Sequence, residues 1–225
     1  MTRKKMSPDK KIVSALLVSV CRFLTGIRAK QNAPLPEGKP CIYYANHSSH
    51  LDGLVIWSCL TGEAREHVHP VAAQDYWDKT KFRRYIAQRI FGAVLITRGK
   101  KIEPVNETEH SDAPPAENPL DIMQKVLSSG DSLILFPEGT RGDGEQIQDF
   151  KAGLWHLSRH NPDVVLVPVY LENLNRVLPK GSRVVVPIIC TATFGAPVEP
   201  AGEHEEKADF LLRTRRVLEA MHHER

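Results

Sequence analysis

The segment "CIYYANHSSHLDG" (residues 41–53) contains an apolar run, a short polar turn and the start of a helix-like pattern. The run Cys41–Ala45 is typical of a buried strand, and Asp52 lies where the next helix is expected to begin. His47 therefore stands at the end of a strand, where ligand sites form in open α/β sheets. This order of strand, turn and helix is the unit from which we predict the fold.

The rest of the chain repeats this alternation of short apolar runs and helical patterns. Strict polar alternation is missing from the strand-like runs, which indicates a sheet covered on both faces. We predict an α/β fold with a mixed, largely parallel central sheet flanked by helices. The expected strands are Cys41–Ala45, Val68–Ala73, Ala93–Thr97, Leu133–Phe136, Val164–Tyr170 and Val184–Thr191, and the expected helices are Asp52–Leu60, Thr80–Gln88, Leu120–Ser128, Lys151–Arg159 and Glu203–His222.

The positive charge of the chain is concentrated at its N-terminus. Residues 1–30 hold eight Lys or Arg and one acid, a net charge of +7, and the remaining residues hold 22 basic and 26 acidic side chains, a net charge of −4. A nucleic-acid-binding domain would spread positive charge over its folded body. The distribution instead favours a basic arm that faces an anionic partner.

A helix over residues 9–29 would place its apolar side chains on one face, namely Ile12, Leu16, Val20, Phe23, Leu24 and Ile27. A basic amphipathic helix of this kind can lie in the interface of an anionic membrane. The alternative is a helix that packs on the domain with its charges in water. The apolar stretch is too short to span a bilayer. We therefore predict an N-terminal membrane-interface arm (1–39), followed by one domain (40–225) with a mobile surface loop over Glu103–Pro119.

The four cysteines, at positions 21, 41, 59 and 190, show no close pairing in sequence. This spacing argues against a disulfide framework and against a structural zinc site. A reducing, cytoplasmic setting fits best.

His47 and Asp52 form the first candidate site. A carboxylate five residues after a histidine can turn back and accept a hydrogen bond from one imidazole nitrogen, which favours the imidazolium that forms when the other nitrogen takes a proton. Such a pair can deprotonate a hydroxyl group. It lacks a nucleophile of its own.

Three other interpretations compete with this one. Asp52 can simply cap a helix, with His47 as an ordinary polar residue. His47, His50 and Asp52 can belong to a metal site, which would need further ligands. A serine hydrolase is suggested by "GDSL" (Gly130–Leu133), although no matching D-x-x-H follows near the C-terminus and a turn explains the motif better.

The stretch "LILFPEGTRGDG" (residues 133–144) contains the second candidate site. A buried strand is expected to end at Phe136, and the turn after it offers free backbone amides, a hydroxyl and a guanidinium as a phosphate cradle. Glu138 could neutralise or orient the arginine. Arg98, at the end of another expected strand, is either a second anion ligand or a solvated strand end. The cradle residues are Glu138, Gly139, Thr140 and Arg141.

Four blocks of the chain, in order, resemble the motifs of the glycerolipid acyltransferase superfamily, of which the PlsC-type 1-acylglycerol-3-phosphate (lysophosphatidic acid) acyltransferases are typical. Residues 46–52 match N-H-x-S-x-x-D, residues 92–98 match G-x-x-x-x-x-R, and residues 136–141 match F-P-E-G-T-R without a difference. Residues 167–169 resemble the short fourth block. Gly142 departs from the serine that commonly follows the arginine, which bears on acceptor choice more than on chemistry.

The resemblance implies that His47 is the general base and Asp52 its partner. His47 would take a proton from the free hydroxyl of a lysophospholipid, which then attacks an acyl thioester without a covalent enzyme intermediate. No cofactor and no metal are implied, since acyl-CoA or an acyl carrier protein is the co-substrate. The residues implied to hold the acceptor phosphate are Arg98, Glu138, Gly139, Thr140 and Arg141, while residues 167–169 either shape the acyl pocket or form a buried strand.

The expected reaction is acylation of 1-acylglycerol 3-phosphate to phosphatidate in phospholipid biosynthesis, at the cytoplasmic face of the membrane, by a peripheral or monotopic enzyme. The alternatives are another lysolipid acceptor, such as a lyso-ornithine lipid, or a lipid hydrolase. No role is implied for His50, which we interpret as structural or solvent-facing. Acyl chain length and the choice between the two donors stay open.

Overall fold

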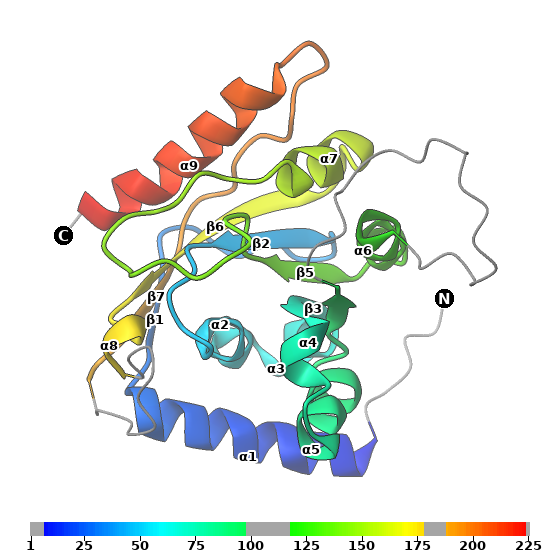
Figure 1. The fold of residues 1–225 in the computed structure, drawn as a ribbon, viewed down its shortest axis with the longest axis vertical. Coiled ribbons are helices and arrows are strands. Elements are labelled where there is room, and N and C mark those ends of the chain that lie inside the picture. Colours follow the sequence, from blue (N-terminus) through cyan, green and yellow to red (C-terminus); the bar gives the residue numbers. More distant parts are fainter. Residues whose placement is uncertain (1–6, 98–117, 178–187, 224–225) are drawn as a thin grey trace.

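The computed structural model describes residues 7–97, 118–177 and 188–223 (Figure 1). Helices cover both faces of one sheet. The strands are β1 (Arg28–Gln31), β2 (Cys41–Ala45), β3 (Val68–Ala73), β4 (Val94–Ile96), β5 (Ser132–Leu135), β6 (Val165–Glu172) and β7 (Thr191–Phe194). The helices are α1 (Pro8–Thr25), α2 (Asp52–Cys59), α3 (Gly62–Glu66), α4 (Gln74–Trp77), α5 (Lys81–Tyr85), the π-helical turn η1 (Ile86–Ile90), α6 (Pro119–Ser128), α7 (Gly153–His160), α8 (Leu174–Val177) and α9 (Lys207–His223).

The seven strands follow the order β1-β7-β6-β2-β5-β3-β4. The five strands from β6 to β4 run parallel to their neighbours, whereas β7 is antiparallel to β6 and carries β1 as a parallel edge strand. The predicted mixed, largely parallel α/β sheet is therefore confirmed. Because the five parallel strands end at one edge of the sheet, the loops after them can combine into one site.

Strand β2 lies in the middle of the sheet, and all five of its residues are buried. Tyr43 packs into the core on the side of α1 and α2, while Tyr44 packs into the core on the side of α6, α7 and α9 (Figure 1). Successive side chains of a strand point to opposite faces, so a strand buried on both faces needs apolar residues at every position. This requirement explains the unbroken apolar run of residues 41–45.

Most of the expected elements exist with shifted ends, and one expected strand agrees with the structure at a single described residue. We predicted a strand over Val184–Thr191, but among its described residues only Thr191 lies in β7, which continues to Phe194. The prediction rested on the β-branched residues of this segment. Pairing of Thr191 with Glu172 and of Phe194 with Val169 instead sets the position of β7. Residues 103–117 of the predicted loop and residues 184–187 lie outside the described part of the chain.

The edge strand β1 was missed, and it lies within the segment predicted as the N-terminal arm. Its residues, Arg28–Gln31, are all exposed and carry no apolar alternation, so no pattern announces it. It follows α1 directly, because Gly26 adopts a left-handed φ of 53° that ends the helix. The division between arm and domain at residue 39 stays a prediction.

Helix α1 packs on the domain with a different face from the apolar one expected in the sequence. Its buried residues are Ser14, Val18, Cys21 and Thr25. The α1 stripe, which we define as Ile12, Leu16, Val20 and Phe23, faces outward, and Phe23 is 87% exposed. In the part of the chain that the structure describes, no helix combines the length and the apolar character that crossing a membrane requires.

Candidate active site

The candidate site forms where β2 and β5 end side by side. These strands are parallel neighbours, with Ile42 opposite Leu133 and Tyr44 opposite Leu135. The loops that follow them, which begin at Asn46 and Phe136, therefore leave the sheet at the same edge. This register brings together two sequence blocks that lie about 90 residues apart, as shown by the 91-residue separation of His47 and Glu138.

Asn46 fixes the end of β2 against β6. Its side-chain amide donates to the carbonyl of Leu171 (2.9 Å), and its side-chain oxygen accepts from the amide of Leu171 (2.8 Å). The side chain thus continues the pairing of the two strands one residue beyond β2. As a result, the backbone directly before His47 is anchored to β6.

The His47–Asp52 pair predicted from the sequence is present. Nδ1 of His47 lies 2.8 Å from Oδ2 of Asp52, whose side chain is fully buried. The same oxygen accepts the backbone amides of Ser48 (2.7 Å) and Ser49 (2.8 Å). Asp52 is also the first residue of α2, where the helix dipole favours negative charge.

This arrangement selects one tautomer of His47. A carboxylate oxygen can only accept, so Nδ1 must carry the proton that lies between His47 and Asp52. Nε2 is then left with a lone pair, and no described residue forms a hydrogen bond with it. The ring also stacks on Phe136, with centroids 4.3 Å apart, so its plane is held from the side of the second loop. His47 is therefore oriented to accept a proton at Nε2.

Glu138 links the loop after β2 to the loop after β5. One carboxylate oxygen accepts the amide of His47 (2.7 Å), and the other accepts the amide of Gln148 (3.0 Å). Only 3% of Glu138 is exposed, and burial raises the pKa of its carboxyl while the two amide donors act in the opposite direction. No ion pair links Glu138 to Arg141 in the described structure, so the expected neutralisation of that arginine is not seen.

The rest of the Pro-Glu-Gly-Thr-Arg turn faces outward. Gly139 has a left-handed φ of 69°, a conformation that glycine adopts without strain. Thr140 is exposed and Arg141 is half-buried. Lys151 lies over the turn, since a side chain added at Gly139 would meet its Nζ at 2.7 Å. The turn therefore offers a hydroxyl and two cations to an anionic ligand.

Arg98 of the second block lies outside the described residues, but the glycine that opens this block is visible. Gly92 has a φ of 57°, and its carbonyl accepts a hydrogen bond from Nδ1 of His69 (2.8 Å). A Cβ at residue 92 would lie 2.7 Å from that nitrogen. The block thus begins with glycine for both conformational and steric reasons. In the fourth block, Val167 and Val169 are fully buried in the core, in agreement with the buried-strand alternative.

A cavity of about 350 Å³ opens beside His47. Asn46, Ser48 and Tyr170 line it together with residues 144–147, and helix α9 closes the far side. Arg215 of α9 pairs with Glu219 (2.8 Å) and with Asp149. The residues that α9 contributes to the wall are Arg215, Glu219 and His222.

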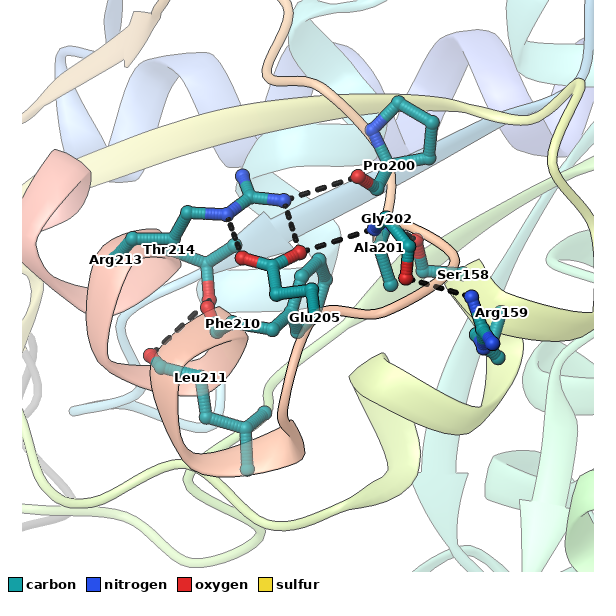
Figure 2. Close-up of polar contacts among 10 residues, drawn as sticks. All are labelled: Ser158, Arg159, Pro200, Ala201, Gly202, Glu205, Phe210, Leu211, Arg213 and Thr214. Carbon is teal, nitrogen blue, oxygen red and sulfur yellow. Dashed lines mark hydrogen bonds and ion pairs between the residues drawn. The ribbon is translucent and has the colours of Figure 1, made fainter.

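Polar contacts at its N-terminal end hold α9 in this place (Figure 2). Arg213 donates to Glu205 (2.9 Å) and to the carbonyl of Pro200 (3.0 Å), and Glu205 accepts the amide of Gly202 (3.1 Å). Arg159 of α7 donates to the carbonyl of Gly202 (2.6 Å). These contacts tie the loop before α9 to α7, so the cavity wall has a fixed position.

The structure also bears on the competing interpretations. Ser132 of the "GDSL" stretch begins β5, and its hydroxyl accepts the amide of Cys41 (3.0 Å). Asp131 contacts His67 (2.9 Å) and His69 (3.0 Å) instead of activating a serine. The stretch is a turn entering a strand, as its position suggested. Within the described residues, no three His, Cys, Asp or Glu side chains are grouped as metal ligands.

Most of the chain is similar to one family of known proteins. The Acyltransferase family model matches residues 26–172, which is most of the chain. The chain belongs to the Acyltransferase family. The family expected from the four motif blocks is therefore confirmed. The first and third blocks are the loops that meet at His47.

Individual members of the family are distant relatives. A chloroplastic 1-acyl-sn-glycerol-3-phosphate acyltransferase of Brassica napus is 25% identical over 72% of the chain and 41% of its own length. The alpha 1-acyl-sn-glycerol-3-phosphate acyltransferase of Ovis aries is 24% identical over 85% of the chain and 61% of its own length. A lyso-ornithine lipid O-acyltransferase of Brucella abortus is 27% identical over 59% and 42%. The chain thus spans less than two thirds of each of these relatives.

A solved structure shares the fold. The crystal structure of the 1-acyl-sn-glycerophosphate acyltransferase PlsC from Thermotoga maritima superposes with a TM-score of 0.68 at 18% sequence identity, covering 98% of this chain and 83% of that one. At this identity the likeness concerns the fold alone.

Several site residues were not found by sequence reasoning. The lining residues of α9 lie about 170 residues from His47, and an amphipathic helix carries no mark of which cavity it will close. The backbone amide of Gln148 has no sequence signal at all. Asn46 belongs to the first motif block, but the block does not indicate its structural role. An Asn side chain at a strand end can both donate to and accept from a neighbouring backbone.

Proposed function

We propose that the chain is an O-acyltransferase that moves a fatty acyl group from an acyl thioester to the free hydroxyl of a lysophospholipid. The favoured acceptor is 1-acylglycerol 3-phosphate, which would give phosphatidate. One observation carries the proposed acyl-transfer reaction: His47 lines a cavity, its Nδ1 is held by a buried carboxylate, and its Nε2 has no partner among the described residues. Membership of the Acyltransferase family supports it.

The reaction proceeds by general-base catalysis. Nε2 of His47 takes the proton of the acceptor hydroxyl, and the hydroxyl oxygen forms a bond to the thioester carbon. The carbon–sulfur bond breaks as the tetrahedral intermediate collapses, and the imidazolium returns the proton to the departing thiolate. Asp52 stabilises the imidazolium between the two transfers. The acyl group passes directly between substrates, so the enzyme needs no nucleophile and no cofactor.

The donor is acyl-CoA or an acyl carrier protein, and the acceptor is held by cations around the Pro-Glu-Gly-Thr-Arg turn. Arg141 and Thr140 face outward there, and Arg98 of the second block would add a further cation. Glu138 is buried and bonded to two backbone amides. We assign it a positioning role, in which it sets the distance between His47 and the turn.

The α1 stripe is proposed to dock on an anionic membrane surface. Four apolar side chains on one exposed helix face form the kind of patch that marks a membrane or protein contact. The net charge of +7 over residues 1–30 favours a lipid surface, since each cation near an anionic membrane contributes about 1 kcal/mol. We place the enzyme at the cytoplasmic face as a peripheral or monotopic protein.

The deciding experiment offers the protein vesicles, one acyl donor and a panel of lysolipids, and follows thiol release together with the lipid products. We expect acylated lipid, with lysophosphatidate as the preferred acceptor, and no turnover by His47→Ala. Release of free fatty acid would instead identify a hydrolase. EDTA should leave the rate unchanged, and strong inhibition would revive the metal interpretation.

One relative supports a second candidate acceptor. The Brucella abortus protein is named a lyso-ornithine lipid O-acyltransferase and is 27% identical to this chain. The 1-acyl-sn-glycerol-3-phosphate acyltransferase of Brassica napus is 25% identical, so sequence identity does not favour either acceptor. Arg141→Ala separates the two acceptors. It should weaken the use of phosphate-bearing acceptors by about 1.5–3 kcal/mol for each charged hydrogen bond lost, and an unchanged acceptor profile would contradict the phosphate assignment.

A further inference from the structure

A stack of three side chains extends from the motif turn to α5. The ring of His50 lies on the ring of Tyr76, with centroids 4.4 Å apart and planes at 18°. The guanidinium carbon of Arg83 lies over the same tyrosine ring, 4.5 Å from its centroid. Both groups thus contact the same ring. Tyr76 is therefore a platform that links the block containing His47 to a cation of α5.

The stack lies beside the candidate site. His50 is three residues from His47 and experiences the charges of Arg141, His47, Arg83 and Asp52. Both arginines are therefore near the same imidazole. None of these stack residues lines the cavity that α9 closes. The stack therefore brings a cation of α5 close to the loop that carries His47, apart from the wall that α9 forms.

Arg83 and Arg141 lack an ion-pair partner in the part of the chain that the structure describes. In contrast, Arg84 of the same helix as Arg83 pairs with Asp78. Partial desolvation and the nearby Arg141, His47 and Arg83 lower the pKa of His50 to about 4, while Asp52 raises it. The ring is therefore uncharged at neutral pH, and the surroundings favour an added anion.

We propose that Arg83 is a specificity-determining residue that binds the phosphate of the lysolipid acceptor together with Arg141. This role rests on the proposed acyltransferase activity and deepens it. The planar guanidinium can give two parallel hydrogen bonds to phosphate oxygens, and an aromatic face holds it flat without consuming a donor. His50, through Tyr76, positions Arg83 and does not take part in the chemistry.

Phospholipid headgroups of a bilayer carry the same phosphate group. They are a second possible partner of Arg83, because Arg83 shares α5 with the exposed Phe82. A short-chain lysophosphatidate used below its micellar concentration, without vesicles, removes this second source. Under these conditions Arg83→Ala should raise KM about tenfold to a hundredfold, the loss expected for one charged hydrogen bond. The kcat should change little, and Arg83→Lys should recover part of the loss.

Two controls separate binding of the acceptor from general effects of charge and structure. Lys81→Ala removes an exposed cation from the same helix and should leave KM unchanged. Tyr76→Leu removes the aromatic face and should resemble Arg83→Ala, while Tyr76→Phe, which restores that face, should recover the loss of acceptor binding. The corresponding phosphate-free 1-acylglycerol should be used equally well, or equally poorly, by the parent and by Arg83→Ala.

The outcomes distinguish this inference from the proposed function. If the parent protein acylates no lysolipid, the proposed function fails. If the parent is active but Arg83→Ala leaves KM for the soluble lysophosphatidate unchanged, or weakens the phosphate-free acceptor equally, the role of Arg83 is wrong. An effect of Arg83→Ala that appears only with vesicles would assign the residue to bilayer lipids, which also overturns the proposal.

Discussion

Nδ1 of His47 lies 2.8 Å from Oδ2 of Asp52, and that single oxygen also accepts two backbone amides of the turn between them. Asp52 therefore shapes the turn and orients the base at the same time. Removing its charge should harm catalysis even where the fold survives.

Asp52→Asn tests this relationship because it preserves the size of the side chain. We expect kcat to fall by about two to four orders of magnitude, the usual contribution of an oriented general base, with little change in KM. Thiol release under saturating donor measures the effect. Thermal unfolding must show that the variant folds, and a kcat within threefold of the parent would contradict the role of Asp52.

Glu138 gives a prediction about the pH dependence of stability. Burial raises the pKa of its carboxyl above the ordinary value of 4.5, so the folded state binds the proton more tightly than the unfolded state. The stability that protonated Glu138 contributes is present below pH 4.5 and is lost as the pH rises through the folded-state pKa. The difference in unfolding free energy between the parent and Glu138→Gln should decline across that window. Urea unfolding at a series of pH values measures it, and a difference that grows with pH would be the wrong sign.

Gly92→Ala should destabilise the protein by about 1–3 kcal/mol, the cost of a side chain in a strained backbone conformation. The φ of 57° and the His69 ring, which is held by Asp131, both oppose a Cβ at this position. Gly62→Ala is the matched control, since a Cβ there meets nothing within 4 Å. Equal unfolding free energies for the two variants would show that the backbone at position 92 accepts a side chain without strain.

The α1 stripe is tested by the double substitution Leu16→Ser and Phe23→Ser. Both side chains are exposed, so thermal stability should change little, while binding to anionic vesicles should fall at least tenfold because each apolar group contributes about 1.5–3 kcal/mol when buried. Leu212→Ser removes an exposed apolar side chain from α9 and serves as the control. Cosedimentation with vesicles gives the measurement. Equal binding by the parent and by the double variant would show that α1 does not contact the membrane.

Much of the fold could be predicted because it depends on local pattern. The apolar run of residues 41–45 predicts a strand buried on both faces, and β2 and β3 have the ends expected for them. The edge strand β1 could not be found, because its exposed polar residues gain their strand conformation from pairing with β7. Of the described residues in the strand predicted over 184–191, only Thr191 belongs to β7, since cross-strand register and not β-propensity decides where β7 begins.

The sequence by itself determined the His47–Asp52 pair, because the two residues are five apart and a single turn after a strand suffices to join them. Only the tertiary structure decided that Glu138 bonds to the amide of His47, that α9 closes the cavity, and that Arg83 reaches the ring stacked on His50. It also decided which face of α1 meets the protein and which faces outward. Local spacing and backbone sterics set contacts within a turn, whereas contacts between distant segments follow from the order and register of the strands, which no periodicity in the chain encodes.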